Sequence, residues 1–103
     1  MLEGRLANRV ALVSGAARGQ GRAHAVRLAS EGADIVAFDL PEPMAWIPYE
    51  VGTKEDLAET VRLVEAQGRR IVAGAADVRD GAAVQAIVDE GIAVLGPIRV
   101  VVA

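Results

Sequence analysis

Residues 10 to 21 constrain the fold of this chain most, because a glycine-rich turn there joins two kinds of hydrophobic pattern. Residues 10 to 13 are all apolar, as in a buried strand, and glycines follow at positions 15, 19 and 21. We predict a strand over Arg9 to Ser14 and a helix over Gln20 to Glu31, with Gly32 ending the helix. A strand that enters a glycine turn and then a helix is the usual form of a phosphate-binding loop.

The rest of the chain alternates between the same two patterns. It predicts helices over Lys54 to Gln67 and from Asp80 to Gly96, and further strands over Ala33 to Asp39, Arg70 to Ala75 and Ile98 to Ala103. Such alternation implies a parallel sheet with right-handed crossovers. We therefore expect an α/β fold, a partial Rossmann-type doubly wound sheet of four strands in the order 3-2-1-4. The first two of its three helices should cover one face, and the third should cross to the other.

Each predicted helix has an apolar stripe that should face the sheet. The three stripes are Ala25, Val26 and Ala29; Leu57, Val61 and Val64; and Val84, Ile87, Val88 and Ile92.

Composition narrows the classes of function. The 103 residues suit one domain, and a net charge of −3 with no basic run argues against a nucleic-acid partner. Cysteine is absent, which excludes disulfides and thiol catalysis, and we expect no metal site. No segment approaches the roughly 20 apolar residues of a membrane span, and the first residues lack a signal-type stretch. We expect a cytoplasmic protein that does not enter membranes.

The three glycines follow the spacing G-x-x-x-G-x-G, and each has a separate predicted role. Side chains at Gly15, Gly19 and Gly21 would block, respectively, the tight turn, the approach of a pyrophosphate and the contact between helix and strand. The start of the helix supplies unpaired N–H groups and partial positive charge.

Asp39 ends the second predicted strand, 24 positions after Gly15. There its carboxylate can accept hydrogen bonds from both hydroxyls of an adenosine ribose, and its charge would repel a 2′-phosphate, so NAD is favoured over NADP. Taken alone, Asp39 is better interpreted as a turn residue after a strand, which is very common, and the glycine turn upstream favours the ribose role. Arg18 can contact a phosphate or remain solvated. Together the turn and the carboxylate indicate dinucleotide binding.

At these residues the sequence resembles the short-chain dehydrogenase/reductase family. Gly15 to Gly21 matches its glycine motif, Asp77-Val78 matches the pair that touches adenine, and residues 100 to 103 match the strand before its Asn-Ala-Gly motif. The resemblance implies an oxidoreductase that transfers hydride between NAD and a small alcohol or ketone. It also implies a homo-oligomer at full length.

The residues expected to bind the cofactor are Gly15, Arg18, Gly19, Gln20, Gly21, Asp39, Leu40, Asp77 and Val78.

Within that family, the chain is more similar to the mycofactocin-coupled subfamily. Residues 14 to 22 resemble its loop sequence, and Leu40 to Thr53, which contains three prolines, occupies the place of an insertion thought to cover a tightly held NAD. Trp46 and Tyr49 in this segment are either a lid over the adenosine end or anchors of a surface loop.

The chain departs from the family pattern in one respect. The catalytic Ser, Tyr and Lys of the family all lie beyond the fourth strand, and here Tyr49 and Lys54 lack the Tyr-x-x-x-Lys spacing. We therefore assign no catalytic residue, and expect residues 1–103 to be the N-terminal dinucleotide-binding portion of a single domain, inactive alone. The alternatives are a non-catalytic NAD-binding module and a Rossmann-like methyltransferase that uses S-adenosylmethionine, which the glycine spacing disfavours.

Four other polar residues near the loop have plainer interpretations. His24 is expected on the helix surface or in packing, and Arg22 flanks the phosphate site or is simply solvated. Asp77 begins a turn or contacts the ligand, and Asp80 is expected to cap the third helix rather than bind a ligand.

Overall fold

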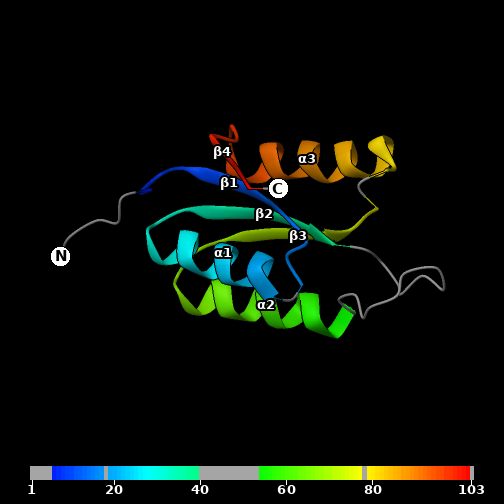
Figure 1. Cartoon of the computed structure of the whole chain (residues 1–103). Coiled ribbons are helices and arrows are strands. Elements are labelled where there is room, and N and C mark those ends of the chain that lie inside the picture. Colours follow the sequence, from blue (N-terminus) through cyan, green and yellow to red (C-terminus); the bar gives the residue numbers. More distant parts are fainter. Residues whose placement is uncertain (1–5, 18, 40–53, 78, 103) are drawn as a thin grey trace.

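A computed structural model describes residues 6–17, 19–39, 54–77 and 79–102 (Figure 1). Its elements follow the predicted order and begin and end within two residues of the predicted bounds: β1 (Val10–Ser14), α1 (Gly19–Ser30), β2 (Asp34–Asp39), α2 (Lys54–Ala66), β3 (Ile71–Ala75), α3 (Gly81–Leu95) and β4 (Val100–Val102). The largest difference is at β4, which begins two residues later than predicted. None of the described helices has the length and apolar character needed to cross a membrane.

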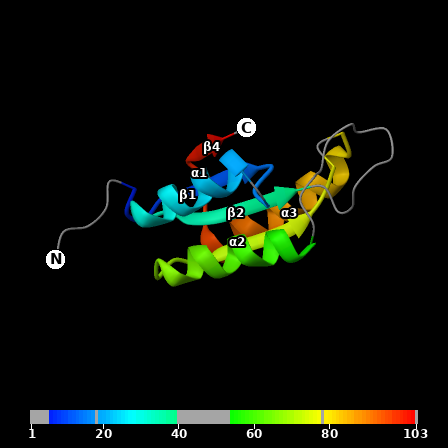
Figure 2. The same ribbon diagram turned by 60° about the horizontal axis from the view of Figure 1, so that its bottom comes forward.

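The four described strands form one parallel sheet in the order β3-β2-β1-β4, as predicted. Leu12 of β1 pairs in register with Val36 of β2 on one side and with Val101 of β4 on the other. Helices α1 and α2 cover one face of the sheet, and α3 covers the opposite face (Figures 1 and 2). The fold is therefore a three-layer Rossmann-type arrangement.

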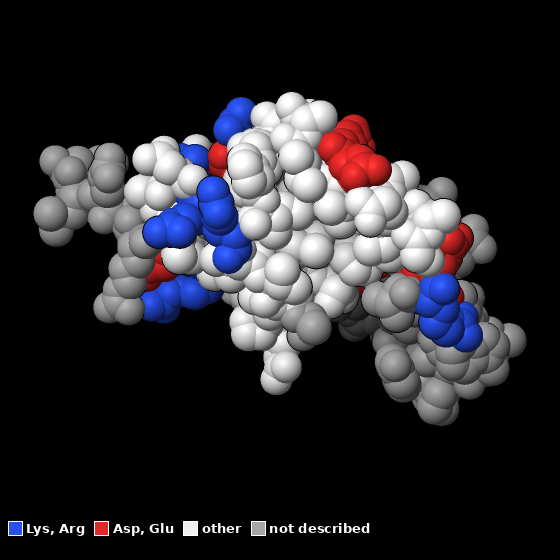
Figure 3. Space-filling view, turned by 90° about the horizontal axis from the view of Figure 1, so that it is seen from above, with Lys and Arg blue, Asp and Glu red and all other residues white. Residues whose placement is uncertain are grey.

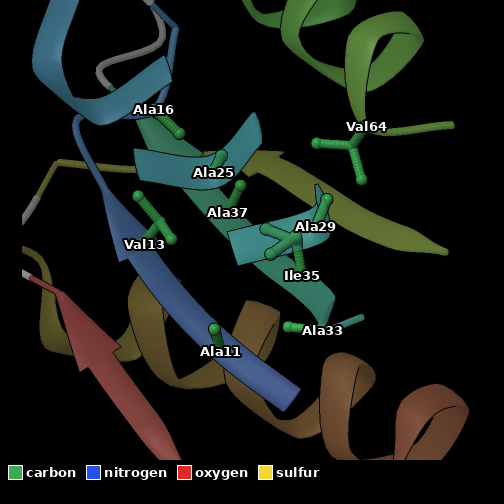
Figure 4. Packing of buried hydrophobic residues seen from close by; sticks show 9 residues of the cluster. All are labelled: Ala11, Val13, Ala16, Ala25, Ala29, Ala33, Ile35, Ala37 and Val64. Carbon is green, nitrogen blue, oxygen red and sulfur yellow. The ribbon is translucent and has the colours of Figure 1, made fainter. Parts of the chain in front are cut away.

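Small side chains make up most of the core between the sheet and the α1–α2 layer (Figure 4). Ala25 and Ala29 of α1 are buried as predicted, but Leu28 rather than Val26 packs against this cluster. Val26 is half-buried outside this cluster. Alanines on both surfaces let α1 lie close to β1 and β2.

The buried face of α2 also differs from the prediction. Leu57 and Val64 pack against the core, but the fully buried residue between them is Thr60, and Val61 is half-buried. An apolar pattern does not include threonine, because a buried hydroxyl needs a hydrogen-bond partner and threonine is therefore counted as polar. The partners of Thr60 lie in the glycine turn and are described below.

Helix α3 packs against the sheet through Val84, Ile87 and a glycine. A Cβ at Gly91 would lie 2.4 Å from Cγ2 of Val36, so the helix approaches β2 most closely at this bare backbone. The predicted stripe through Val88 and Ile92 is therefore wrong in part, since Val88 is half-buried and Ile92 is 44% exposed. The residues of α3 that are buried against the sheet are therefore Ile87 and Gly91 rather than Ile92.

An ion-paired carboxylate fixes the amino-terminal ends of β2 and β3. Asp34 is buried and accepts hydrogen bonds from the backbone N–H of Arg70 (2.9 Å) and from the guanidinium groups of Arg69 and Arg70. Burial would raise the pKa of Asp34, but these hydrogen bonds and the two positive charges outweigh it and lower the pKa below 3.8. This cluster lies at the edge of the sheet opposite the glycine turn.

Candidate cofactor-binding site

The carboxyl ends of the strands bring three predicted site segments together. Ser14 pairs with Phe38, and Asp39 pairs with Ala75, so the residues that follow β1, β2 and β3 lie at one edge of the sheet. The backbone N–H of Ala76 donates to the carbonyl of Asp39 at 2.8 Å, which joins two of these segments directly. Ligands of open parallel sheets bind at this edge.

The glycine turn has the backbone geometry that its sequence predicts. Gly15 and Gly19 have φ angles of +61° and +56°, a conformation that side chains disfavour. Among the described residues, and apart from its chain neighbours and its own helix, a Cβ at Gly19 would have no heavy atom within 4 Å, so the turn is open to them on that side. A Cβ at Gly21 would lie 1.8 Å from the carbonyl oxygen of Gly15. The start of α1 thus rests directly on the turn.

The two alanines inside the turn have their polar backbone groups bonded within the protein. The N–H of Ala16 donates to the carbonyl of Phe38 at 3.3 Å, and the N–H of Ala17 donates to Oδ2 of Asp39 at 2.8 Å. Their carbonyls accept from the hydroxyl of Thr60, at 2.8 Å from Ala16 and 3.3 Å from Ala17.

The N–H groups suited to a phosphate are therefore those at the start of α1, which begins at Gly19. In any α-helix the first four N–H groups have no intrahelical acceptor, and here they belong to Gly19, Gln20, Gly21 and Arg22.

Asp39 lies where the sequence places it, half-buried at the end of β2. Its carboxylate does more than was predicted, because it also accepts the N–H of Ala17 and so ties the turn to the neighbouring strand. A carboxylate has two oxygens and about four acceptor positions, so it can hold this amide and a ribose hydroxyl together.

Asp77 forms the turn that leads into α3. Its carboxylate accepts from the backbone N–H of Arg79 at 2.9 Å and from the guanidinium of the same residue at 2.6 Å. These hydrogen bonds, led by those of the side chain, lower the pKa of Asp77. Asp80 then caps α3 by accepting from the N–H of Ala83 at 3.1 Å, as predicted.

Other predicted residues fall into two groups. Arg18, Leu40 and Val78, like the aromatic residues of the segment 40–53, lie outside the described residues. His24 is exposed on α1, in agreement with a surface position.

Arg22 was expected beside the phosphate or in solvent, and the structure corrects this. Its Nε donates to the hydroxyl of Thr60 at 3.0 Å, and its Nη2 donates to the carbonyl of Asp56 at 2.8 Å. The side chain therefore crosses from α1 to α2, where two acceptors lie within reach of one guanidinium fork. Nothing in the sequence pattern points to Thr60, because its main acceptor is a backbone carbonyl 44 positions away.

Comparison with known proteins agrees with the fold. The family model described as short chain dehydrogenase matches residues 9–103. This chain therefore belongs to the short-chain dehydrogenase family.

Three relatives illustrate the similarity. An uncharacterised NAD-dependent oxidoreductase of Mycobacterium tuberculosis is 52% identical over 101 residues, which are 97% of this chain and 37% of that protein. The (-)-trans-carveol dehydrogenase of Rhodococcus erythropolis is 44% identical over 97 residues, which are 94% of this chain and 35% of that protein. The crystal structure of carveol dehydrogenase from Mycobacterium avium in complex with NAD is 54% identical with a TM-score of 0.93, over 97% of this chain and 36% of that one. This chain thus spans little more than a third of the length of these relatives.

Proposed function

We propose that residues 1–103 are the dinucleotide-binding portion of an NAD-dependent oxidoreductase. In the whole protein, hydride would pass between a small alcohol or ketone and the nicotinamide ring, which supplies that chemistry when it is bound. The role of this portion is to hold the adenosine and pyrophosphate groups in place. Residues in other parts of the protein would supply the proton transfers.

One observation carries the proposal: the carboxylate of Asp39 and the open side of the glycine turn lie at the same edge of the sheet. The 2.8 Å hydrogen bond from Ala17 N to Asp39 Oδ2 fixes the carboxylate relative to the turn. The positive φ and open surroundings of Gly19 leave room for a phosphate beside the start of α1. These groups fit an adenine dinucleotide, with Asp39 toward the ribose and Gly19, Gln20 and Gly21 toward the pyrophosphate. Similarity to proteins whose names record NAD supports the same assignment.

The remaining predicted contacts belong to the same proposal. Gly15 would shape the turn, Arg18 would contact a phosphate, Asp77 and Val78 would contact the adenine as the family resemblance implies, and Leu40 is a further expected cofactor contact.

Calorimetric titration of the 103-residue chain with NAD, NADP and S-adenosylmethionine tests the assignment. We expect NAD to bind most tightly, and preference for S-adenosylmethionine would refute the oxidoreductase proposal. An alcohol oxidation assay on the same chain should show no turnover, because its single Tyr and single Lys lack the catalytic spacing. Tight NAD binding by a full-length protein that oxidises no alcohol would instead favour a non-catalytic module.

We further propose membership of the mycofactocin-coupled subfamily, a cytoplasmic location and a homo-oligomeric full-length protein. The loop sequence of residues 14 to 22 and the long segment 40–53 support the subfamily assignment. Such a protein should retain NAD through gel filtration, and mass spectrometry of the denatured protein would detect it. A full-length protein that loses NAD during dialysis would contradict this assignment.

A further inference from the structure

We propose that Thr60 and Arg22 are positioning residues, which hold the glycine turn in the shape that binds a dinucleotide. The inference rests on the proposed NAD binding and extends it to two residues whose side chains bond to each other and to the protein backbone. Thr60 is fully buried on α2, yet its hydroxyl lies 2.8 Å from the carbonyl oxygen of Ala16. This contact joins a helix to a turn 44 positions earlier in the chain.

The turn is held from two directions. On the β2 side, Asp39 accepts the N–H of Ala17. On the α2 side, the one hydroxyl hydrogen of Thr60 faces the carbonyl of Ala16 at 2.8 Å, with that of Ala17 at 3.3 Å. These peptide groups are therefore fixed with their carbonyl oxygens toward α2. A carbonyl that rotated toward the ligand would present a partial negative charge to a diphosphate, which would weaken binding.

Arg22 directs the hydroxyl of Thr60 toward the turn. A threonine inside a helix commonly donates back to the carbonyl four residues earlier, here Asp56, whose oxygen is 3.3 Å from Oγ1. Nη2 of Arg22 donates to that carbonyl at 2.8 Å, and its Nε donates to Oγ1 itself at 3.0 Å. Arg22 thus occupies the carbonyl of Asp56 and also donates to Oγ1. The hydroxyl hydrogen of Thr60 therefore points to the carbonyl of Ala16, which is the shortest contact of that hydroxyl.

Thr60→Val keeps the shape of the side chain, removes the hydroxyl and leaves the carbonyl of Ala16 without this donor. We expect the Kd for NAD to rise about tenfold, which is the size of one lost hydrogen bond to a buried group. Without ligand, amide exchange of residues 15 to 21 should quicken about tenfold, because the turn opens more often. Thr60→Ser restores a hydroxyl, so both values should return to within about twofold of the original protein.

Two further variants separate positioning from general stability. Val64→Ala removes a fully buried side chain one turn further along α2, so it should lower stability while the Kd for NAD and the exchange of the turn stay unchanged. Arg22→Lys keeps the positive charge but loses the planar fork that presents two N–H groups to the two acceptors in fixed geometry, and should weaken NAD binding about threefold even if Thr60→Val fails to fold.

Each outcome decides one part of the inference. If the original chain fails to bind NAD, the proposed function is refuted, and amide exchange still tests the link between Thr60 and the turn. If Thr60→Val quickens exchange but leaves the Kd unchanged, the contact is structural alone and the positioning role is refuted. Unchanged exchange in Thr60→Val, or equal weakening of NAD binding by Val64→Ala, would also overturn it.

Discussion

At the scale of single residues, Gly21 makes the tightest backbone contact of the site. Because an added Cβ would lie 1.8 Å from the carbonyl oxygen of Gly15, Gly21→Ala must displace either the turn or the start of α1. We expect a loss of roughly 2–4 kcal/mol in the free energy of unfolding, measured by urea denaturation. Gly81→Ala is the matched control, since an added Cβ there meets nothing within 4 Å, and it should stabilise by about 0.5 kcal/mol. Similar stabilities for the two variants would contradict the contact.

Asp39 has one observed role, its hydrogen bond with Ala17, and one proposed role toward the ribose, and one substitution can separate them. Asp39→Asn keeps an oxygen that accepts the N–H of Ala17 and removes the negative charge. We expect the original chain to prefer NAD over NADP by about tenfold or more, and the variant by about threefold or less, because repulsion of the 2′-phosphate is lost. Parallel titrations measure both ratios. An unchanged preference would show that Asp39 does not face the ribose.

Asp34 should make stability depend on acid pH. Its pKa is lowered in the folded protein, so its contribution is fully present above its ordinary value of 3.8 and is lost as the pH falls through the lowered value. At pH 7, Asp34→Asn should cost about 1–3 kcal/mol, because the buried side chain loses its charge and part of its bonding to Arg69 and Arg70. Urea unfolding at a series of pH values should show the two proteins converging below pH 3.8. A constant difference down to pH 2 would contradict this ion pair.

Sequence reasoning succeeded at residues whose type alone states a backbone requirement. Glycine in a tight turn and aspartate at a helix start are such cases: Gly15 has a φ of +61°, and Asp80 caps α3. It failed at Arg22 and Thr60, because a long side chain can reach many acceptors and a threonine on a helix has no preferred distant partner. Neither choice can be made until the packing of α1 against α2 is known.

At the scale of elements, the type and order of every described helix and strand were predicted. The apolar periodicity and the glycines at the ends of elements indicate the same boundaries along this chain. The helix faces were predicted less well. The buried line of α3 passes through Gly91, which contributes no hydrophobic side chain to a periodic pattern. A hydrophobic pattern contains information about side chains alone. It therefore cannot show where a helix backbone lies close to a strand, as α3 does at Gly91.

Gly91→Ala tests that line of contact. At an open position in a helix, replacing glycine by alanine raises the free energy of unfolding by about 1 kcal/mol. A decrease at position 91 would therefore come from the collision of the new Cβ with Val36. With Cγ2 of Val36 at 2.4 Å, we expect a net loss of about 1–3 kcal/mol, measured by urea denaturation. In the double variant with Val36→Ala, the total loss should be smaller than the sum of the single losses by about 1 kcal/mol, because the collision is removed. Strict additivity would place α3 further from the sheet.

At the scale of the whole molecule, the layers could be predicted because alternating strands and helices leave few ways to build a parallel sheet. The face of the sheet that bears α3 is covered only in part, since α3 is the single described helix on it (Figure 1). From that side, uncharged residues cover the centre of the surface, with charged side chains around them (Figure 3). Ile92, Val94 and Val101 are 44%, 54% and 68% exposed.

We expect this surface to make the 103-residue chain self-associate. Val101 lies on β4, an outer strand of the described sheet, where exposed apolar residues and unpaired backbone groups favour pairing with another chain. Val101→Lys places a charge on that strand and should shift sedimentation velocity toward the monomer, by about tenfold in the association constant. Ala58→Lys adds the same charge at an exposed position on α2, in the opposite layer, and should leave association unchanged. If the original chain sediments as a monomer at all concentrations and melts sharply, the exposed strand and helix do not drive association. If both lysine variants reduce association equally, net charge rather than the β4 surface controls it.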